Sequence, residues 1–190
     1  LQTADYILST IPIKEELPIP VIELGHAFTW KESGDIREHL KCDRQRAIMA
    51  YFSEQLFLPH MDARTKDEVL QQLCKATMAR SQLPNTFYEY VLERECIGGT
   101  ALGNLVATPH PARPLGLESL VMVGILDRPI PWDQEEVQIV FLLSMKEGGD
   151  RNLPLFYKMI SRFLMDKALV RRLIKNQTFE EMLSIFAILS

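Results

Sequence analysis

The chain has 190 residues, of which 47% are hydrophobic and 24% are charged, the composition of an ordinary globular protein with a full core. Its formal net charge is −4, so it lacks the concentrated basic surface that a nucleic-acid-binding chain needs. No run approaches the roughly 18 uncharged apolar residues of a membrane-spanning helix, and no secretory signal opens the chain, so we expect no membrane association.

The three cysteines, Cys42, Cys74 and Cys96, are widely spaced and form no C-x-x-C pair. This pattern is typical of reduced thiols and predicts a cytoplasmic protein. The sequence opens with LQTADY rather than with a methionine, which favours a fragment of a longer protein.

The first part of the chain predicts the end of a small α/β domain. DYILST, from Asp5, and PVIEL, from Pro20, are short apolar runs typical of strands. Apolar residues then recur at roughly helical spacing between residues 33 and 58. We therefore expect residues 1–40 to be the C-terminal part of such a domain and residues 41–56 to be a helical linker.

Residues 57–190 predict a complete second domain. Thr65, followed three residues later by Glu68, forms a capping-box signature at the start of a helix, and Thr178 is a candidate N-cap for the last helix. Further predicted elements are, in chain order, a helix over 85–95, a loop over 96–104, strands over 105–109, 119–127 and 137–145, and two or three helices over 152–188. The last two strands are almost entirely apolar, as in a sheet covered on both faces. The predicted fold class is α/β, a mixed central sheet with helices on both faces.

One histidine stands out by its setting. The stretch VATPHPARP, from Val106, places His110 between Pro109 and Pro111 at the end of a predicted strand, and the two prolines restrict the backbone around it. A neutral imidazole nitrogen is nucleophilic near pH 7, and the partner of the other nitrogen sets its orientation. This setting suits a functional histidine, while an ordinary loop histidine remains the alternative.

A second candidate group precedes His110 in the sequence. Arg94 and Glu95 are followed by Gly98, Gly99 and Thr100. An arginine fork can bind phosphate through two hydrogen bonds, and a glycine turn can direct several N–H groups at one oxyanion. The segment matches neither a P-loop nor a G-x-G-x-x-G fingerprint, and alone it is more typical of a solvated helix end and a turn. This segment becomes a stronger candidate for a phosphate site only if it lies beside His110.

The remaining polar side chains form no recognisable site. The four histidines have no metal-ligand spacing, and no cysteine pair joins them; they are His26, His39, His60 and His110. No G-x-S-x-G elbow marks a serine nucleophile. We therefore expect neither a metal site nor a cofactor. Asp127, Asp133 and Glu135 surround the turn RPIPW and are expected to be solvated.

Three ordered segments carry a resemblance to a known family. They are LERECIGGTALGNLVATPHPARP, VMVGILDRPIPW and VQIVFLLSMKEGGDRNLPLFYKMISRFL. Together they resemble the enzyme IIA domain of the mannitol–fructose class, which belongs to the bacterial phosphoenolpyruvate-dependent sugar phosphotransferase system (PTS). The matching positions are Arg94, Glu95, Thr100, Gly103, Asn104, Pro109, His110, Pro129, Ile130 and Trp132. The resemblance covers about residues 57–188.

The resemblance implies roles for individual residues. The family's phosphorylated histidine stands in its Pro-His pair, which places that role on His110, with the small phosphocarrier protein HPr as the donor. Arg94, Thr100 and Asn152 are then the candidates for holding phosphate oxygens or orienting the ring. Two positions depart from the pattern. Pro111 replaces a small residue, and Asn152 stands where mannitol-type members have a second active-site histidine; asparagine cannot carry a proton as an imidazolium does.

The first part of the chain resembles the end of an enzyme IIB-like domain of the galactitol class. The phosphorylatable cysteine of that class belongs upstream of Leu1. A IIB-like piece followed by a IIA-like domain is the C-terminal order of transcription regulators and antiterminators that carry PTS-regulation domains.

We therefore expect a regulatory phosphoacceptor that couples sugar uptake to operon expression. Its expected partners are HPr, PTS IIB proteins and the other domains of the same regulator, with no nucleic-acid binding by this part of the chain. The alternative is a catalytic IIA phosphotransferase of a fructose- or mannitol-class transporter. A third reading is a IIA-like domain that only mediates protein contacts.

Overall fold

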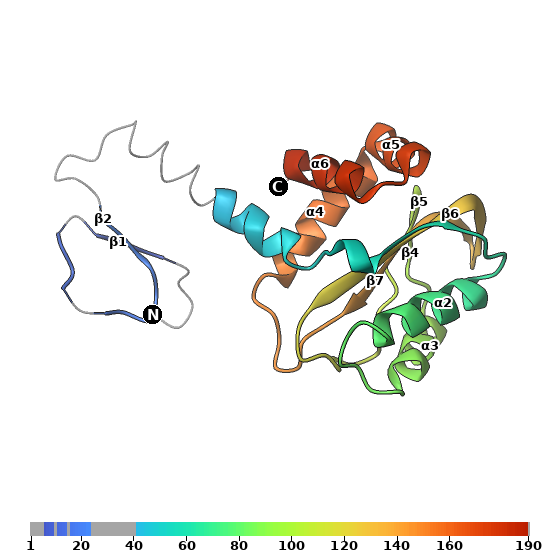
Figure 1. Ribbon diagram of the computed structural model, residues 1–190, viewed down its shortest axis with the longest axis horizontal. Helices are drawn as coiled ribbons and strands as arrows, with labels where there is room; N and C mark the ends of the chain where they lie inside the picture. The colour runs from blue at the N-terminus through green and yellow to red at the C-terminus, as the bar shows by residue number, and fades with distance from the viewer. Residues whose placement is uncertain (1–5, 10, 15, 24–40, 190) are drawn as a thin grey trace. The chain divides into compact units, whose positions relative to one another are not determined.

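The computed structural model describes residues 6–9, 11–14, 16–23 and 41–189, and the chain divides into two compact units, Leu1–Asp43 and Arg44–Ser190 (Figure 1). In the first unit, β1 (Ile7–Ser9) pairs in parallel with β2 (Val21–Glu23). Both strands fall within the two apolar runs predicted to be strands. The predictions that fall on residues 24–40, including the beginning of the predicted helix over 33–58, lie outside the described residues.

The second unit is built on a five-stranded mixed sheet with the order β3-β6-β7-β5-β4. The strands are β3 (Phe57–Met61), β4 (Ala101–Gly103), β5 (Leu105–Ala107), β6 (Leu120–Trp132) and β7 (Glu135–Ser144). The pairs β3–β6 and β5–β7 are parallel, whereas β6–β7 and β4–β5 are antiparallel. The predicted mixed sheet is therefore confirmed.

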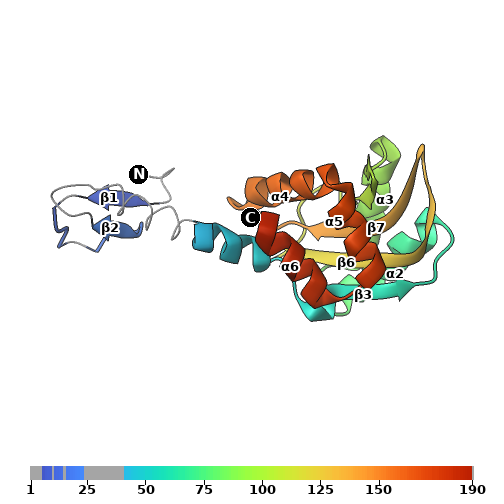
Figure 2. The same ribbon diagram turned by 90° about the horizontal axis from the view of Figure 1, so that it is seen from above.

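Helices cover both faces of this sheet (Figures 1 and 2). On one side lie α2 (Lys66–Met78) and α3 (Phe87–Ile97), and on the other lie α4 (Leu153–Met165), α5 (Lys167–Asn176) and α6 (Phe179–Leu189). The central strands β6 and β7 contribute side chains to the hydrophobic clusters on both faces of the sheet. On β6, Val121 and Val123 belong to the cluster with α4–α6, and Leu120 and Met122 belong to the cluster with α2 and α3. Because side chains alternate along a strand, two covered faces require an almost continuous apolar run.

The segment that leads into the sheet contributes to the core of the second unit. Residues 41–49 are helical, and a 3-10 helix, η1 (Glu54–Leu56), follows them. Ile48, Tyr51 and Phe52 are buried in the same cluster as α4–α6, and the Tyr51 carbonyl accepts a hydrogen bond from the Val121 N–H at 2.9 Å. This segment therefore packs as part of the second unit.

Two strands of the sheet were not predicted. The helix expected over 33–58 overlaps the first residues of β3. This strand is a short edge strand with an irregular register, and its few apolar positions also fit a helical period. The expected loop over 96–104 contains β4, which has three residues and pairs only with β5. Both are edge strands, and nothing local in such short segments distinguishes a strand from its neighbours until the sheet forms.

The helix starts followed the sequence more closely. Thr65 caps α2 by accepting a hydrogen bond from the Glu68 N–H at 3.2 Å, and Thr178 accepts one from the Glu181 N–H at 3.2 Å. Both predicted caps are confirmed. The packing of α2 on the sheet is close: a Cβ atom at Gly124 of β6 would lie 2.7 Å from Met61 Sδ and 2.9 Å from Leu73 Cδ2. A glycine at this position therefore lets helix and strand approach each other.

Candidate functional site

His110 lies in a loop that starts at the end of β5, and three contacts hold this loop in place. The Leu143 N–H of β7 donates to the Pro109 carbonyl at 2.9 Å, and the Ala112 N–H donates to the Tyr90 carbonyl of α3 at 2.9 Å. The Arg113 guanidinium also stacks 4.0 Å from the centre of the Tyr90 ring. The loop is thus fixed to a central strand and to a helix, in addition to the stiffness that its prolines provide.

The hydrogen bonds of the His110 ring define which nitrogen carries the proton. Nδ1 lies 3.0 Å from the Thr108 carbonyl oxygen, and Nε2 lies 3.1 Å from Arg94 Nε. A carbonyl oxygen only accepts and a guanidinium N–H only donates, so Nδ1 is the protonated nitrogen and Nε2 carries the lone pair. The half-buried ring therefore directs a nucleophilic nitrogen at a cationic side chain.

Arg94 comes from the last turn of α3. Its Nη1 group donates to the Gly98 carbonyl at 2.7 Å, an acceptor that the end of the helix leaves exposed. One edge of the guanidinium is thus fixed by the backbone while Nε meets the histidine. A cation held beside a nucleophilic nitrogen is suited to binding a transferred anion such as a phosphoryl group.

Thr100 has its hydroxyl turned into the protein. The residue is buried, and its Oγ1 donates to Glu95 Oε1. Its backbone carbonyl accepts a hydrogen bond of 3.0 Å from the Thr108 N–H, next to the carbonyl that binds His110. Thr100 is thus connected to His110 through the backbone, and its side chain faces a buried carboxylate.

Asn152 lies apart from this group in the described contacts. It occupies the N-cap position of α4, and its backbone N–H donates to Asp150 Oδ1 at 2.8 Å, while its side chain makes no capping hydrogen bond. Among the described residues, no hydrogen bond joins the Asn152 side chain to His110 or Arg94. The structure thus connects Arg94, Thr100 and His110, but not Asn152.

Two further side chains near the site, Lys66 and Tyr157, were not identified in the sequence analysis. Lys66 of α2 forms ion pairs with Glu95 at 2.7 Å and with Asp133 at 2.8 Å. Asp133 is exposed, as expected, and it is also an ion-pair partner. Tyr157 of α4 lies within electrostatic reach of Arg94: burial raises the pKa of its hydroxyl, and the positive charge of Arg94 partly offsets that rise. A lysine directly after an N-cap looks like an exposed residue in sequence, so only the fold could reveal its role.

Among the described residues there is neither a metal-binding cluster nor a membrane-spanning helix. No group of three or more His, Cys, Asp or Glu side chains in these residues is arranged to hold a metal ion. None of the described helices has the length and apolar character required to cross a bilayer.

Comparison with known families decides the membership of the chain. Residues 44–188 match the family model described as "Phosphoenolpyruvate-dependent sugar phosphotransferase system, EIIA 2". The chain belongs to this EIIA 2 family. The resemblance inferred from the ordered motifs is therefore confirmed for the second unit.

Individual relatives include both regulators and transport components. The chain is 31% identical over 185 residues to the probable licABCH operon regulator of Bacillus subtilis. This match covers 97% of the chain and 29% of the regulator. It is also 31% identical over 135 residues to a nitrogen regulatory protein of Bradyrhizobium diazoefficiens, over 69% of this chain and 88% of the relative. The chain thus spans less than a third of the operon regulator.

The fold of the second unit is shared with solved structures. The crystal structure of IIA mannitol from Escherichia coli superposes with a TM-score of 0.58 at 18% identity, and the match covers 71% of this chain and 98% of that one. The mixed sheet with helices on both faces is therefore the architecture of EIIA proteins.

Proposed function

We propose that the chain is a phosphorylatable regulatory domain of a PTS-controlled transcription regulator or antiterminator, and that His110 accepts the phosphoryl group. The observation that carries this proposal is the arrangement of the His110 ring. Nδ1 is bound by the Thr108 carbonyl, and Nε2 presents its lone pair to Arg94. A fixed tautomer beside a fixed cation is the geometry that phosphoryl acceptance requires.

The phosphoryl donor in this proposal is the phosphohistidine of HPr. The Nε2 lone pair of His110 forms the new N–P bond in line as the N–P bond of the donor breaks, and the electron pair of that bond returns to the donor imidazole. Such a transfer needs positioning and charge stabilisation rather than covalent assistance. Arg94 would exchange its contact with Nε2 for the phosphoryl oxygens, whose charge at pH 7 is close to about −2.

The other proposed site residues take supporting parts. Thr100 would act through its backbone, because its hydroxyl is engaged by Glu95. Asn152 is kept as a proposed phosphate contact on the resemblance alone, since its side chain has no described bond to His110 or Arg94. Asparagine in place of an imidazole removes a proton carrier, which favours a phosphate that is kept as a signal over one that is passed on quickly.

The regulatory assignment is supported by the extent of the match to the operon regulator, which runs over both units of this chain. By contrast, the match to the nitrogen regulatory protein covers 69% of the chain. The division into a IIB-like end over 1–40, a linker over 41–56 and an EIIA domain over 57–190 stays a prediction, as do the cytoplasmic location and the partnership with HPr.

The direct test is phosphorylation by phosphorylated HPr, measured as acid-labile phosphate on the chain. We expect labelling of the wild-type chain and none of His110→Ala. The matched control is His60→Ala, which removes an exposed histidine of the same unit and should label like the wild type. Equal labelling of His110→Ala and the wild type would overturn the assignment of His110.

The second candidate function is that of a catalytic EIIA phosphotransferase for fructose- or mannitol-class sugars. It is favoured by the fold shared with IIA mannitol and by the Arg94–His110 pair, which suits both functions. Transfer from the phosphorylated chain to a sugar-specific IIB protein separates the two. We expect slow transfer, and rapid transfer would support the catalytic function instead.

A further inference from the structure

An ion-pair network lies behind the His110 loop. The Lys66 ammonium group lies 2.7 Å from Glu95 Oε2 and 2.8 Å from Asp133 Oδ2. The Glu95 side chain is 4% exposed, so its charge is removed from water, and Lys66 is the cation that compensates it. The ammonium also lies 5.5 Å from the centre of the buried Trp132 ring.

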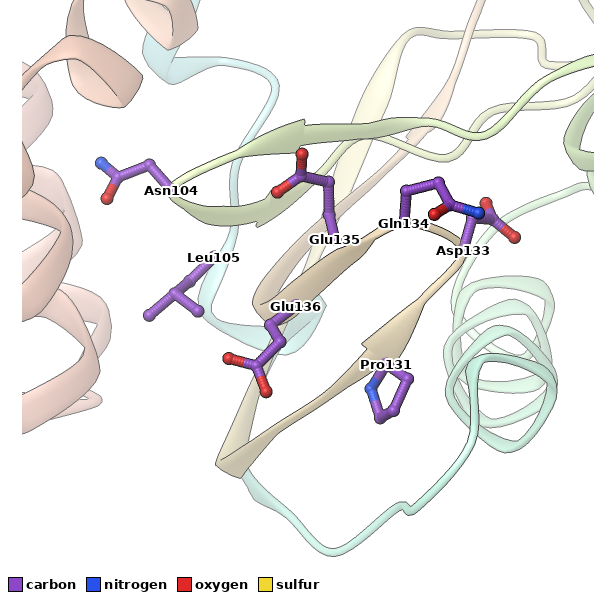
Figure 3. A pocket seen from close by; sticks show the side chains of 7 residues that line it. All are labelled: Asn104, Leu105, Pro131, Asp133, Gln134, Glu135 and Glu136. Carbon is purple, nitrogen blue, oxygen red and sulfur yellow. The ribbon is translucent and has the colours of Figure 1, made fainter.

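The two carboxylates of this network lie in different surroundings. Figure 3 shows Asp133 in the turn between β6 and β7, at the rim of an open pocket of about 510 Å³. The Asp133 side chain is 46% exposed, in contrast to that of Glu95. Gly99 passes so close that a Cβ atom there would lie 2.4 Å from Asp133 Oδ2. Lys66 thus connects a surface turn with a buried carboxylate, and Asp133 of that turn lies against Gly99, which precedes Thr100.

The network continues to His110 through three successive hydrogen bonds. The Thr100 hydroxyl donates to Glu95, the Thr108 N–H donates to the Thr100 carbonyl, and His110 Nδ1 donates to the Thr108 carbonyl. Glu95 also neighbours Arg94 on α3, so the same network fixes the end of the helix that carries the arginine. The Thr108 carbonyl is therefore connected to Lys66 through hydrogen bonds, and Arg94 is connected to it through the backbone of α3.

The charge state of Lys66 suits this role. Burial alone would lower the pKa of its ammonium group, but hydrogen bonds and charge interactions with Asp133 and Glu95 outweigh that effect and raise the pKa above its ordinary value. Lys66 therefore stays charged over the whole range of pH in which phosphoryl transfer would be measured.

We propose that Lys66 is a positioning residue for the phosphoacceptor: through Glu95 and Thr100 it fixes the Nδ1–H tautomer of His110 and the orientation of Arg94. This inference rests on the proposed function for its consequence in phosphoryl transfer, but the tautomer is a property of the unphosphorylated chain. Failure of the inference and failure of the proposed function can therefore be distinguished.

The experiment compares Lys66→Met, Lys66→Arg and the control Lys75→Met, which removes an exposed lysine of the same helix. Nitrogen-15 NMR of the histidine rings reports the His110 tautomer, and phosphorylation by phosphorylated HPr gives the rate. We expect Lys66→Met to lose the pure Nδ1–H signature and to slow phosphorylation about tenfold. Lys66→Arg should restore both, and Lys75→Met should match the wild type.

A folded Lys66→Met chain with the wild-type His110 spectrum would overturn the inference, whatever the phosphorylation result. If Lys66→Met does not fold, Thr100→Val replaces it, because this change removes the hydroxyl that connects Glu95 to the loop while the Lys66–Glu95 ion pair remains. An unchanged His110 spectrum in Thr100→Val would then overturn the inference. Absence of phosphorylation in the wild-type chain, together with a shifted tautomer in the variants, would instead count against the proposed function alone.

Discussion

The second unit contains two Pro-His pairs, and only the histidine of the second pair is proposed as the phosphoacceptor. Pro59-His60 lies in the edge strand β3, and Pro109-His110 follows β5 near the opposite edge of the sheet. Both rings place Nδ1 3.0 Å from an oxygen, of Asp127 for His60 and of Thr108 for His110. Orientation of the imidazole by an acceptor at Nδ1 is therefore common to both histidines.

The difference lies at the other nitrogen and in the degree of burial. His110 is half-buried and its Nε2 meets Arg94, whereas the His60 side chain is 67% exposed. Arg128, which follows Asp127 in the sequence, binds the exposed carboxylate of Asp62 at 3.0 Å. The Pro-His pair alone therefore does not distinguish the two histidines, and the neighbouring cation of His110 comes from tertiary structure.

We expect removal of Arg94 to have the largest effect on the phosphorylation rate of His110. Arg94→Ala should slow phosphorylation of His110 by about a hundredfold, because it deletes a fixed donor to the charge of the transferred group. Phosphorylation rates with phosphorylated HPr measure this. The matched control is Arg128→Ala, which removes the exposed guanidinium that pairs with Asp62 and should leave the rate unchanged. Equal losses in the two variants would show that charge in general, rather than Arg94, controls transfer.

The two histidine sites can be compared only at pH values where the chain stays folded, and we expect its stability to fall at alkaline pH. Burial raises the pKa of the Cys74 thiol from 9.0 to about 12, so the unfolded chain releases this proton at lower pH than the folded chain. The raised pKa of Cys74 therefore stabilises the folded state by its full amount below about pH 9. This stabilisation is lost as the pH rises from about 9 to about 12. Burial followed by the hydrogen bond to Asp67 raises the pKa of Tyr88 to about 12 and acts in the same direction.

We expect the free energy of unfolding to fall with pH above 9, and to fall less steeply in Cys74→Ala. Urea unfolding at several pH values measures both slopes. A control with Cys96→Ala, which removes an exposed thiol, should keep the wild-type slope. If the slopes of Cys74→Ala and the wild type coincide, the thiol is not the titrating group.

The smallest expected effect belongs to the proline that distinguishes the two motifs. His110 is followed by Pro111, whereas His60 is followed by Met61. The His110 loop is also held by hydrogen bonds from Leu143 and Ala112, so the site should survive Pro111→Ala. We expect a loss of about 0.5–1 kcal/mol in unfolding free energy, since alanine frees the unfolded chain, and a phosphorylation rate within about threefold of the wild type. A rate that changes tenfold would mean that Pro111 itself shapes the site.

Sequence reasoning reached the parts of the site that lie in continuous, ordered motifs. Arg94 and His110 were predicted as separate candidates, and the structure joins them because the end of α3 lies beside the end of β5. The apolar runs of β6 and β7 likewise predicted a sheet covered on both faces, since burial of both faces leaves no polar alternation to hide the signal.

The rest required the fold. Lys66 follows a correctly predicted N-cap, yet its contact with Glu95 depends on the packing of α2 beside α3. The role of Thr100 toward the phosphate stays a prediction. That its hydroxyl donates to Glu95 was not predicted, because the rotation of one side chain leaves no trace in a sequence. The edge strands β3 and β4 are too short to carry a period of their own.

We propose that Nε2 of His110 is the phosphorylated nitrogen, rather than Nδ1 of His110 or either ring nitrogen of His60. The most direct measurement is nitrogen-15 and phosphorus-31 NMR of the chain after phosphorylation by phosphorylated HPr, in which N–P coupling identifies the bonded nitrogen. We predict phosphorus bound to Nε2 of His110, with the His60 signals unchanged. Phosphorus on Nδ1 of His110, or on His60, would contradict this account.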